Sequence, residues 1–235
     1  MKMNPVLMLC YNNLELTKGA VQSVLSQDIP VRLFLVDNGS TDGTKEWIKS
    51  QPFEHYSYIA NESPAKQGNR WARHIFALGA EYVLGVPNDV RIPSNCYSEL
   101  LKWPRGFVCA SDNGQTEPEV RTARAVSENT PMAVMLTRKW AWQALIAKDG
   151  YFLDEGYFHY ASDCDLALRM AACGIRGVQL DTPYWHYGSA THKLPEIHAQ
   201  SCVQADKDRA YFVRKWGFRV DSLEYGRVAA DPNWR

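Results

Sequence analysis

Short apolar runs alternate with stretches whose apolar residues recur at helical spacing. The run from Val6 to Cys10 precedes a helical pattern over 14–25, and the run over 31–36 ends in a turn-rich cluster, 37–43. An apolar run of this length between turn signals indicates a strand, and apolar positions three to four residues apart indicate a helix. The pattern predicts strands at 6–10, 31–36, 56–60, 82–86, 107–110, 133–137 and 177–180. It predicts helices at 14–25, 44–50, 69–78, 139–147 and 199–215, and two more helices that begin at Pro93 and at Ser162.

This alternation of strands and helices predicts an α/β fold with a mostly parallel central sheet and helices on both faces. In such sheets ligands bind beyond the carboxyl ends of the strands. Asp37 and Asp89 each directly follow a predicted strand. The first half of the chain therefore already nominates a site.

Composition changes this picture little. Apolar residues make up 46% of the 235 residues, which suits one folded domain, 1–235, and Lys plus Arg (26) equal Asp plus Glu (26). A neutral chain has no general attraction to nucleic acid or anionic membranes. We expect no integral membrane segment and a cytoplasmic protein, with peripheral membrane attachment left open. The six scattered cysteines favour free thiols.

The turn from Val36 to Thr44 reads Val-Asp-Asn-Gly-Ser-Thr-Asp-Gly-Thr. By turn chemistry alone, Asp37 and its neighbour would only stabilise a tight turn. However, this segment resembles the nucleotide-binding signature of the family-two inverting glycosyltransferases, which have the GT-A fold, a Rossmann-like nucleotide-diphospho-sugar transferase fold. The resemblance implies that Asp37 binds the base of a nucleoside-diphosphate sugar, with Tyr11 of the preceding Tyr-Asn pair beside it.

A second segment, 68–90, is similar to the family's Gly-Asn helix and its metal-binding turn. By this resemblance Asn88 and Asp89 lie at the donor, and Asp89 binds the divalent cation, Mn²⁺ or Mg²⁺, that bridges the two phosphates. Pro87 stands where the family usually has an acid or amide. Asn69 and Arg73 are one helical turn apart and could meet the donor on one face, although Arg73 could equally be a solvated helix charge.

A third segment, 152–169, resembles the family's acceptor-side signature, in which an aromatic stretch precedes Glu-Asp-X-Asp-Leu. Asp163 matches the catalytic base and Asp165 the second acid, whereas Ser162 replaces the usual glutamate. A competing interpretation is a capping box formed by Ser162 and Asp165 at a helix start. Residues two apart do not share a helical face, so Asp165 could pair with Arg169 and leave Asp163 facing the cleft.

His186 resembles the family's late histidine, which often joins the metal site, although a lone histidine is more often structural. Trp185, Tyr157, Phe158 and Tyr160 could stack on a sugar at the acceptor side or belong to the core. The last predicted helix ends in Lys-Trp-Gly, as in many family members, and its apolar stripe would attach it to the domain without a catalytic role.

Together these features predict a metal-dependent inverting glycosyltransferase, with a nucleotide-sugar-binding half (1–90), an acceptor-side half (91–198) and a C-terminal helix and tail (199–235). The expected donor is a UDP-, GDP- or dTDP-linked sugar, and the acceptor is a glycan or another hydroxyl-bearing molecule, nucleic acid not excluded. The alternative is a catalytically silent relative that binds nucleotide sugar or glycan. Pro87 and Ser162 support it, because both depart from the family's pattern. A sugar-phosphate nucleotidyltransferase would need a Gly-rich basic loop after the first strand, where this chain has Tyr11, Asn12 and Asn13.

Overall fold

The computed structural model describes residues 3–112, 120–127, 133–187 and 195–230. A single twisted sheet runs through the middle of these residues, in the order β3-β2-β1-β4-β8-β6-β9-β5, with β7 paired to β9. The strands are β1 (Pro5–Cys10), β2 (Arg32–Asp37), β3 (Glu54–Ser57), β4 (Tyr82–Gly85), β5 (Val90–Arg91), β6 (Phe107–Asp112), β7 (Ala125–Ser127), β8 (Met135–Arg138) and β9 (Val178–His186).

The two halves of the sheet differ in direction. The pairs β3-β2, β2-β1 and β1-β4 are all parallel, as the alternation of strands and helices predicted. Beyond β4 the sheet is mixed, because β8 runs antiparallel to both of its neighbours while β6 and β9 pair in parallel. Parallel strands end at the same edge, so β1, β2 and β4 bring the residues that follow them together.

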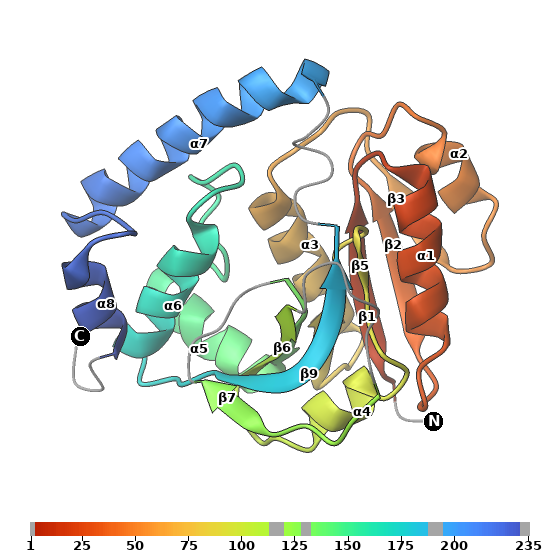
Figure 1. Ribbon diagram of the computed structural model, residues 1–235, viewed down its shortest axis with the longest axis horizontal. Coiled ribbons are helices and arrows are strands. Elements are labelled where there is room, and N and C mark those ends of the chain that lie inside the picture. Colours follow the sequence, from red (N-terminus) through yellow and green to blue (C-terminus); the bar gives the residue numbers. More distant parts are fainter. Residues whose placement is uncertain (1–2, 113–119, 128–132, 188–194, 231–235) are drawn as a thin grey trace.

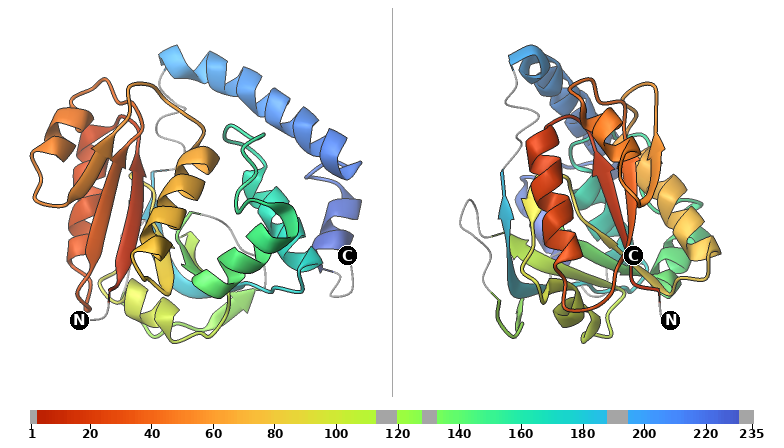
Figure 2. Two further views of the ribbon diagram at one scale, coloured as in Figure 1. Left: turned by 180° about the vertical axis from the view of Figure 1, so that it is seen from behind. Right: turned by 90° about the vertical axis from the view of Figure 1, so that its right-hand side faces the viewer.

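Helices cover both faces of the parallel half. In β1, Val6 and Met8 enter one buried cluster, whereas Leu7 enters a different one. Side chains alternate across a strand, so both faces of β1 are buried. The first cluster also contains residues of α1 (Leu14–Leu25), α2 (Thr44–Lys49) and α4 (Cys96–Leu101), and the second contains residues of α3 (Pro64–Ala77). The sheet is therefore a middle layer between helices (Figures 1 and 2).

The second half of the chain adds helices beside the mixed strands. A third cluster packs α5 (Lys139–Asp149) and α6 (Ser162–Ala172) against β6 and β8. The long helix α7 (Pro195–Trp216) crosses the top of the molecule in Figure 1, and α8 (Leu223–Ala230) packs on α6. The segment between α5 and α6 lies below α7, on the side where β1 and β2 end (Figure 1).

The elements follow the sequence pattern with a few informative differences. The helix predicted at 69–78 begins earlier, at Pro64, because proline suits the first turn of a helix. The strand predicted at 177–180 continues to His186, and β5, β7 and α8 were not predicted. No helix within the described ranges has both the length and the apolar character needed to cross a membrane.

Candidate active site

The turn after β2 holds two carboxylates at the end of the strand. Asp37 is fully buried, and its Oδ1 accepts a hydrogen bond from the amide of Ser40 at 3.1 Å, while its Oδ2 is buried without a hydrogen-bond partner. Gly39 has φ 86°, and a Cβ there would lie 2.5 Å from the backbone of Ala60. Only glycine fits this close approach, so the turn's shape is set by its sequence.

The turn after β1 is fastened to this one. Asn12 has φ 54°, its amide donates to Ser40 Oγ at 2.8 Å, and its Oδ1 accepts from the amide of Thr41 at 2.9 Å. Asn88, after β4, donates from Nδ2 to the carbonyl of Asn12 at 2.9 Å and to Thr17 Oγ1 at 2.8 Å. Both amide hydrogens of buried Asn88 are thus used to join the turns, and its contact with the donor stays a prediction.

Asp89 and His186 meet at the same edge of the sheet. The short strand β5 pairs with the end of β9, with Val90 opposite His186, and this brings His186 Nε2 to 3.5 Å from Asp89 Oδ2. On the other side of the ring, His186 Nδ1 lies 3.2 Å from Asp112 Oδ2, at the end of β6. Hydrogen bonding to Asp89 raises the pKa of His186 against its partial burial, and the carboxylate of Asp112 acts in the same direction.

This pair could supply two ligands to a divalent cation whose other ligands come from a bound molecule. A carboxylate oxygen and an imidazole nitrogen at this separation can share one ion, and Asp112 would hold the ring with Nε2 available, as acidic partners of metal-bound histidines do. Among the residues that the structure describes, no group of three or more His, Cys, Asp or Glu side chains could hold a metal ion. The remaining ligands would therefore have to come from elsewhere, and Mn²⁺ or Mg²⁺ accepts phosphate oxygens readily.

A cavity of about 260 Å³ lies beside Asp89, between α1 and the β5–β9 pair. Trp185, which pairs with Arg91 across the strands, forms one wall. The indole is almost completely buried, with the Arg91 guanidinium 4.1 Å from its ring centre and the Tyr187 ring edge-on at 3.9 Å. Trp185 therefore lies next to the predicted cation site, and little of its surface remains for stacking on a sugar.

The two acids at the start of α6 have different surroundings. Asp163 is exposed, and its Oδ1 accepts from the amide of Cys164 at 2.9 Å. Asp165 is completely buried and pairs with Arg169 at 2.8 Å, which confirms the predicted pair. Because its carboxylate is out of reach of any acceptor, the prediction of an acceptor-side contact for Asp165 is wrong.

The capping box predicted at this helix start is also absent. The residue that precedes the helix is Ala161, with φ 60°, and no side chain caps the first turn. The Asp165 carboxylate points instead to α7, where it accepts from Lys215 Nζ at 2.6 Å and from Trp216 Nε1 at 2.9 Å. Asp165 thus makes tertiary contacts, besides its predicted pair with Arg169, and not the contact with Ser162 that the competing interpretation offered.

Helix α7 fastens the whole segment before α6. Lys215 also pairs with Asp154 at 2.6 Å, and its pKa is raised because these hydrogen bonds outweigh its burial. The buried carboxylate of Asp208 accepts hydrogen bonds from three successive amides, those of Phe158, His159 and Tyr160, at 3.1, 2.8 and 2.8 Å. The aromatic segment that leads to Asp163 is therefore held by one acid, Asp208, and one lysine, Lys215, from further along the chain.

The remaining predicted donor residues are spread over the edge and α3. Tyr11 is half-buried directly after β1, at the carboxyl edge. Asn69 is buried and uses its side chain for Leu153 and Glu155, with Nδ2 donating to the Leu153 carbonyl at 2.8 Å and Oδ1 accepting from the Leu153 amide at 2.8 Å. Arg73 is exposed one turn further from the edge. Asn69 and Arg73 thus do not form one donor-facing pair, and Asn69 instead positions the acceptor-side segment.

Two residues of this region were missed from the sequence. Asp112 lies at the end of a predicted strand, the position that singled out Asp37 and Asp89, so the same rule could have found it. Asp208 lies inside a long helix, where an acidic residue is usually a solvated surface charge. Nothing in the neighbouring sequence indicates that it holds residues 158–160.

A comparison with known protein families identifies the family of the chain. The sequence profile of Glycosyl transferase family 2 matches residues 6–142, more than half of the chain. This stretch contains the turns after β1, β2 and β4 together with Asp112. No curated protein sequence matches significantly.

Several solved glycosyltransferases share the fold. S. aureus TarS 1–349 in complex with UDP is 19% identical and superposes with a TM-score of 0.58, covering 96% of this chain and 77% of that one. The mannosyltransferase PcManGT from Pyrobaculum calidifontis, in complex with GDP-Man and Mn²⁺, is 18% identical with a TM-score of 0.60, covering 89% and 64%. At these identities the likeness establishes the GT-A fold.

Proposed function

Since the chain belongs to glycosyl transferase family 2, we propose that it moves a sugar from a nucleoside-diphosphate donor to an acceptor hydroxyl, with a divalent cation and with inversion at the anomeric carbon. In this proposal 1–90 supplies the donor side, 91–198 the acceptor side and 199–235 the brace that holds the acceptor side in place. Asp163 is the catalytic base, and Asp89 with His186 binds the cation.

The observation that carries the proposal is the meeting of Asp89 and His186. They are 97 residues apart along the chain, yet strand pairing brings their side chains to 3.5 Å at the edge where β1, β2 and β4 end. Asp89 lines an open cavity, and His186, with a carboxylate behind its ring, lies next to Asp89. This arrangement suits an ion whose remaining ligands come from a bound diphosphate. A site that is purely structural would not need that open side.

The turn after β2 supports a nucleotide at the neighbouring position. Asp37 Oδ2 is a buried acceptor without a partner, which costs free energy unless a donor reaches it. An N–H of a nucleobase is such a donor, once the groups covering Asp37 move aside. The solved relatives carry UDP, UDP-GlcNAc and GDP-Man, which supports UDP- and GDP-linked donors, and dTDP-linked sugars share the same diphosphate chemistry.

The exposed position of Asp163 suits a general base. Its carboxylate takes the proton of the acceptor hydroxyl as that oxygen bonds to the anomeric carbon, and the bond from this carbon to the diphosphate oxygen breaks on the opposite face. The bonding electrons leave with the diphosphate. The cation, when bound, stabilises the charge that develops there. Asp165, Lys215 and Asp208 hold the start of α6 so that Asp163 keeps its position.

The test is donor binding and turnover with a panel of UDP-, GDP- and dTDP-sugars in Mn²⁺ or Mg²⁺. Asp89→Ala should abolish metal-dependent binding measured by calorimetry, because the carboxylate ligand is lost. Asp163→Asn should keep donor binding and lose transfer. Asp206→Asn is the matched control, since Asp206 is an exposed helical acid that is remote from this edge in sequence and should leave both properties unchanged.

The outcomes separate the proposal from its alternative. A wild-type protein that binds a nucleotide sugar but never transfers it to any acceptor pool would be a silent binding module, and one that binds none would refute the roles of Asp37 and Asp89. Inversion is checked by the anomeric configuration of the product, because retention would exclude a single displacement by one base.

A further inference from the structure

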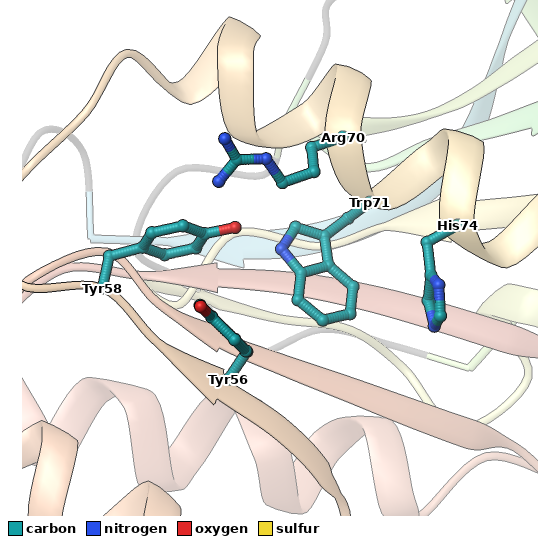
Figure 3. Close-up of a pocket in the computed structure, with 5 residues that line it drawn as sticks. All are labelled: Tyr56, Tyr58, Arg70, Trp71 and His74. Carbon is teal, nitrogen blue, oxygen red and sulfur yellow. The ribbon is translucent and has the colours of Figure 1, made fainter.

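A second concave site lies away from the carboxylates, between the edge strand β3 and helix α3. It has a volume of about 360 Å³ and is lined by Tyr56, Tyr58, Arg70, Trp71 and His74. Figure 3 shows the two tyrosines entering from the strand side and the other three side chains from the helix. None of these five residues takes part in the proposed transfer reaction, so the site needs its own explanation.

Aromatic rings form most of the surface of this site. The ring centres of Tyr56 and Tyr58 are 4.8 Å apart, those of Tyr56 and Trp71 are 5.9 Å apart, and those of Trp71 and His74 are 5.4 Å apart. Tyr56 is 51% exposed, which is unusual for a large aromatic side chain in a well-packed domain. These rings offer flat apolar faces to a ligand.

The polar groups of the site are mainly hydrogen-bond donors. Trp71 Nε1 is buried and has no hydrogen-bond partner, and Figure 3 shows it on the side of the indole that faces the tyrosines. The guanidinium of Arg70 lies over the Tyr58 ring at 5.1 Å and is 4.0 Å from Glu62, which pairs more closely with Lys66 at 2.9 Å. A buried N–H without a partner is costly, so a ligand oxygen that reaches it would be stabilising.

We propose that this site binds one sugar unit of the acceptor glycan. A sugar ring has a C–H face that stacks on aromatic rings and a rim of oxygen atoms that accept hydrogen bonds, which matches flat rings edged by Arg70 and Trp71 Nε1. The volume is at the small end of the range for ligand sites, about 300–1,000 Å³, and suits a single ring. An apolar peptide side chain would leave Trp71 Nε1 without an acceptor.

The position of the site relative to the turn after β2 indicates which sugar unit of the acceptor it binds. The amide of Tyr58 donates to the carbonyl of Asp37 at 2.9 Å, and Asn38 bonds to Asn61 and to the carbonyl of Glu62, both at 2.7 Å. The segment 58–62 thus separates the two sites. The bound unit is one remote from the reacting hydroxyl, so this proposal, which rests on the proposed transferase function, identifies the acceptor as a saccharide of several units.

The probes are cellotetraose, maltotetraose and tetragalacturonate, titrated into the ¹⁵N-labelled full chain. The readout is the indole N–H resonance of Trp71, assigned from Trp71→Phe. At least one tetrasaccharide should shift this resonance, since the unpartnered N–H gains an acceptor. Tyr56→Ala should weaken the binding about ten-fold by removing an exposed stacking face. The control is Trp140→Ala, because Trp140 is also 51% exposed but lies on α5, outside the site.

Turnover then tests the acceptor assignment, with the donor found in the panel above. The tetrasaccharide that shifts Trp71 should be glycosylated, and Tyr56→Ala should raise its KM about ten-fold with kcat unchanged. No shift with any of the three probes up to millimolar concentration, equal affinity in Tyr56→Ala, or a shift caused by UMP instead would overturn the saccharide site. Binding without glycosylation would overturn the acceptor assignment.

The two proposals fail in different ways. Asp89→Ala should lose donor binding and still shift Trp71 with the tetrasaccharide, whereas Tyr56→Ala should keep donor binding. A wild-type chain that shifts Trp71 but binds no nucleotide sugar would refute the transferase roles and leave the saccharide site standing.

Discussion

Replacing Asp208 with alanine tests whether α7 holds the acceptor-side segment. The carboxylate accepts hydrogen bonds from the amides of Phe158, His159 and Tyr160, and it is almost completely buried. Alanine removes these three contacts together, along with a hydrogen bond from Gln204 Nε2, and leaves the amides to find other partners. The segment should then separate from α7 while the sheet stays intact.

The structure sets the size of the effect. A hydrogen bond to a charged group contributes about 1.5–3 kcal/mol, but residues 158–160 are only partly buried, so water can replace part of each contact. Taking about 1 kcal/mol for each amide, we expect the free energy of unfolding to fall by about 3 kcal/mol in Asp208→Ala. Asp208→Asn keeps one carbonyl acceptor and should lose about half as much.

The assay is urea denaturation followed by circular dichroism, together with hydrogen exchange of the three amides. Asp206→Ala is the matched control, because Asp206 lies on the same helix two residues earlier and its side chain is 82% exposed, so its loss should change the free energy of unfolding by less than about 0.5 kcal/mol. If Asp208→Ala unfolds at the same urea concentration as Asp206→Ala and the three amides exchange at wild-type rates, the brace does not exist.

Three other predictions concern Asp112, Ala161 and Asp154. Asp112→Ala should weaken Mn²⁺ binding in the presence of donor about ten-fold in calorimetry, since the histidine loses the carboxylate that orients it, and an unchanged affinity would argue against that role. Ala161→Gly should raise the free energy of unfolding by up to about 1 kcal/mol, because alanine at φ 60° is strained. Ala167→Gly, inside the helix that follows, should lower this free energy by about 1 kcal/mol. Equal effects of the two variants in urea melts would show that Ala161 is not strained. Burial of Asp154 opposes ionisation, but hydrogen bonding to Lys215 outweighs this effect and lowers the pKa of Asp154. The contribution of Asp154 to the free energy of unfolding is therefore complete above the usual carboxyl pKa, and it is lost as the pH falls through the lowered pKa. Between about pH 5 and about pH 2 the wild type should lose more stability than Asp154→Asn, and parallel curves would refute this.

Much of the donor side could be predicted from the sequence because its signals are local. The strand β1, the helix α1 and the turn after β2 each follow from apolar spacing and turn residues within about ten positions. A glycine at position 39 is typical of a tight turn, whereas the close approach that requires it here is to the backbone of Ala60. Asp37 and Asp89 are at the ends of predicted strands, and parallel strands end at one edge.

The pairing of Asp89 with His186 was predicted only through the family resemblance, and the tertiary structure supplied its geometry. Strand β5 has two residues, too few for any periodicity, and it exists because β9 offers it a partner. The side-chain environment of Asp165 is similar in kind. Its helical spacing allowed a pair with Arg169, which forms, and a cap with Ser162, which does not. The contacts with Lys215 and Trp216 come from the fold, since a buried carboxylate needs charged or polar partners.

The sequence by itself thus determined most of the strands and helices, and Asp37 and Asp89 among the carboxylates at the sheet edge, because backbone propensity and side-chain periodicity act over a few residues. Only the tertiary structure decided which side chains meet across long separations: Asp208 with residues 158–160, Asn69 with Leu153, and Tyr56 with Trp71. Such contacts depend on how helices and strands pack, and packing is a property of the whole chain that no short segment encodes.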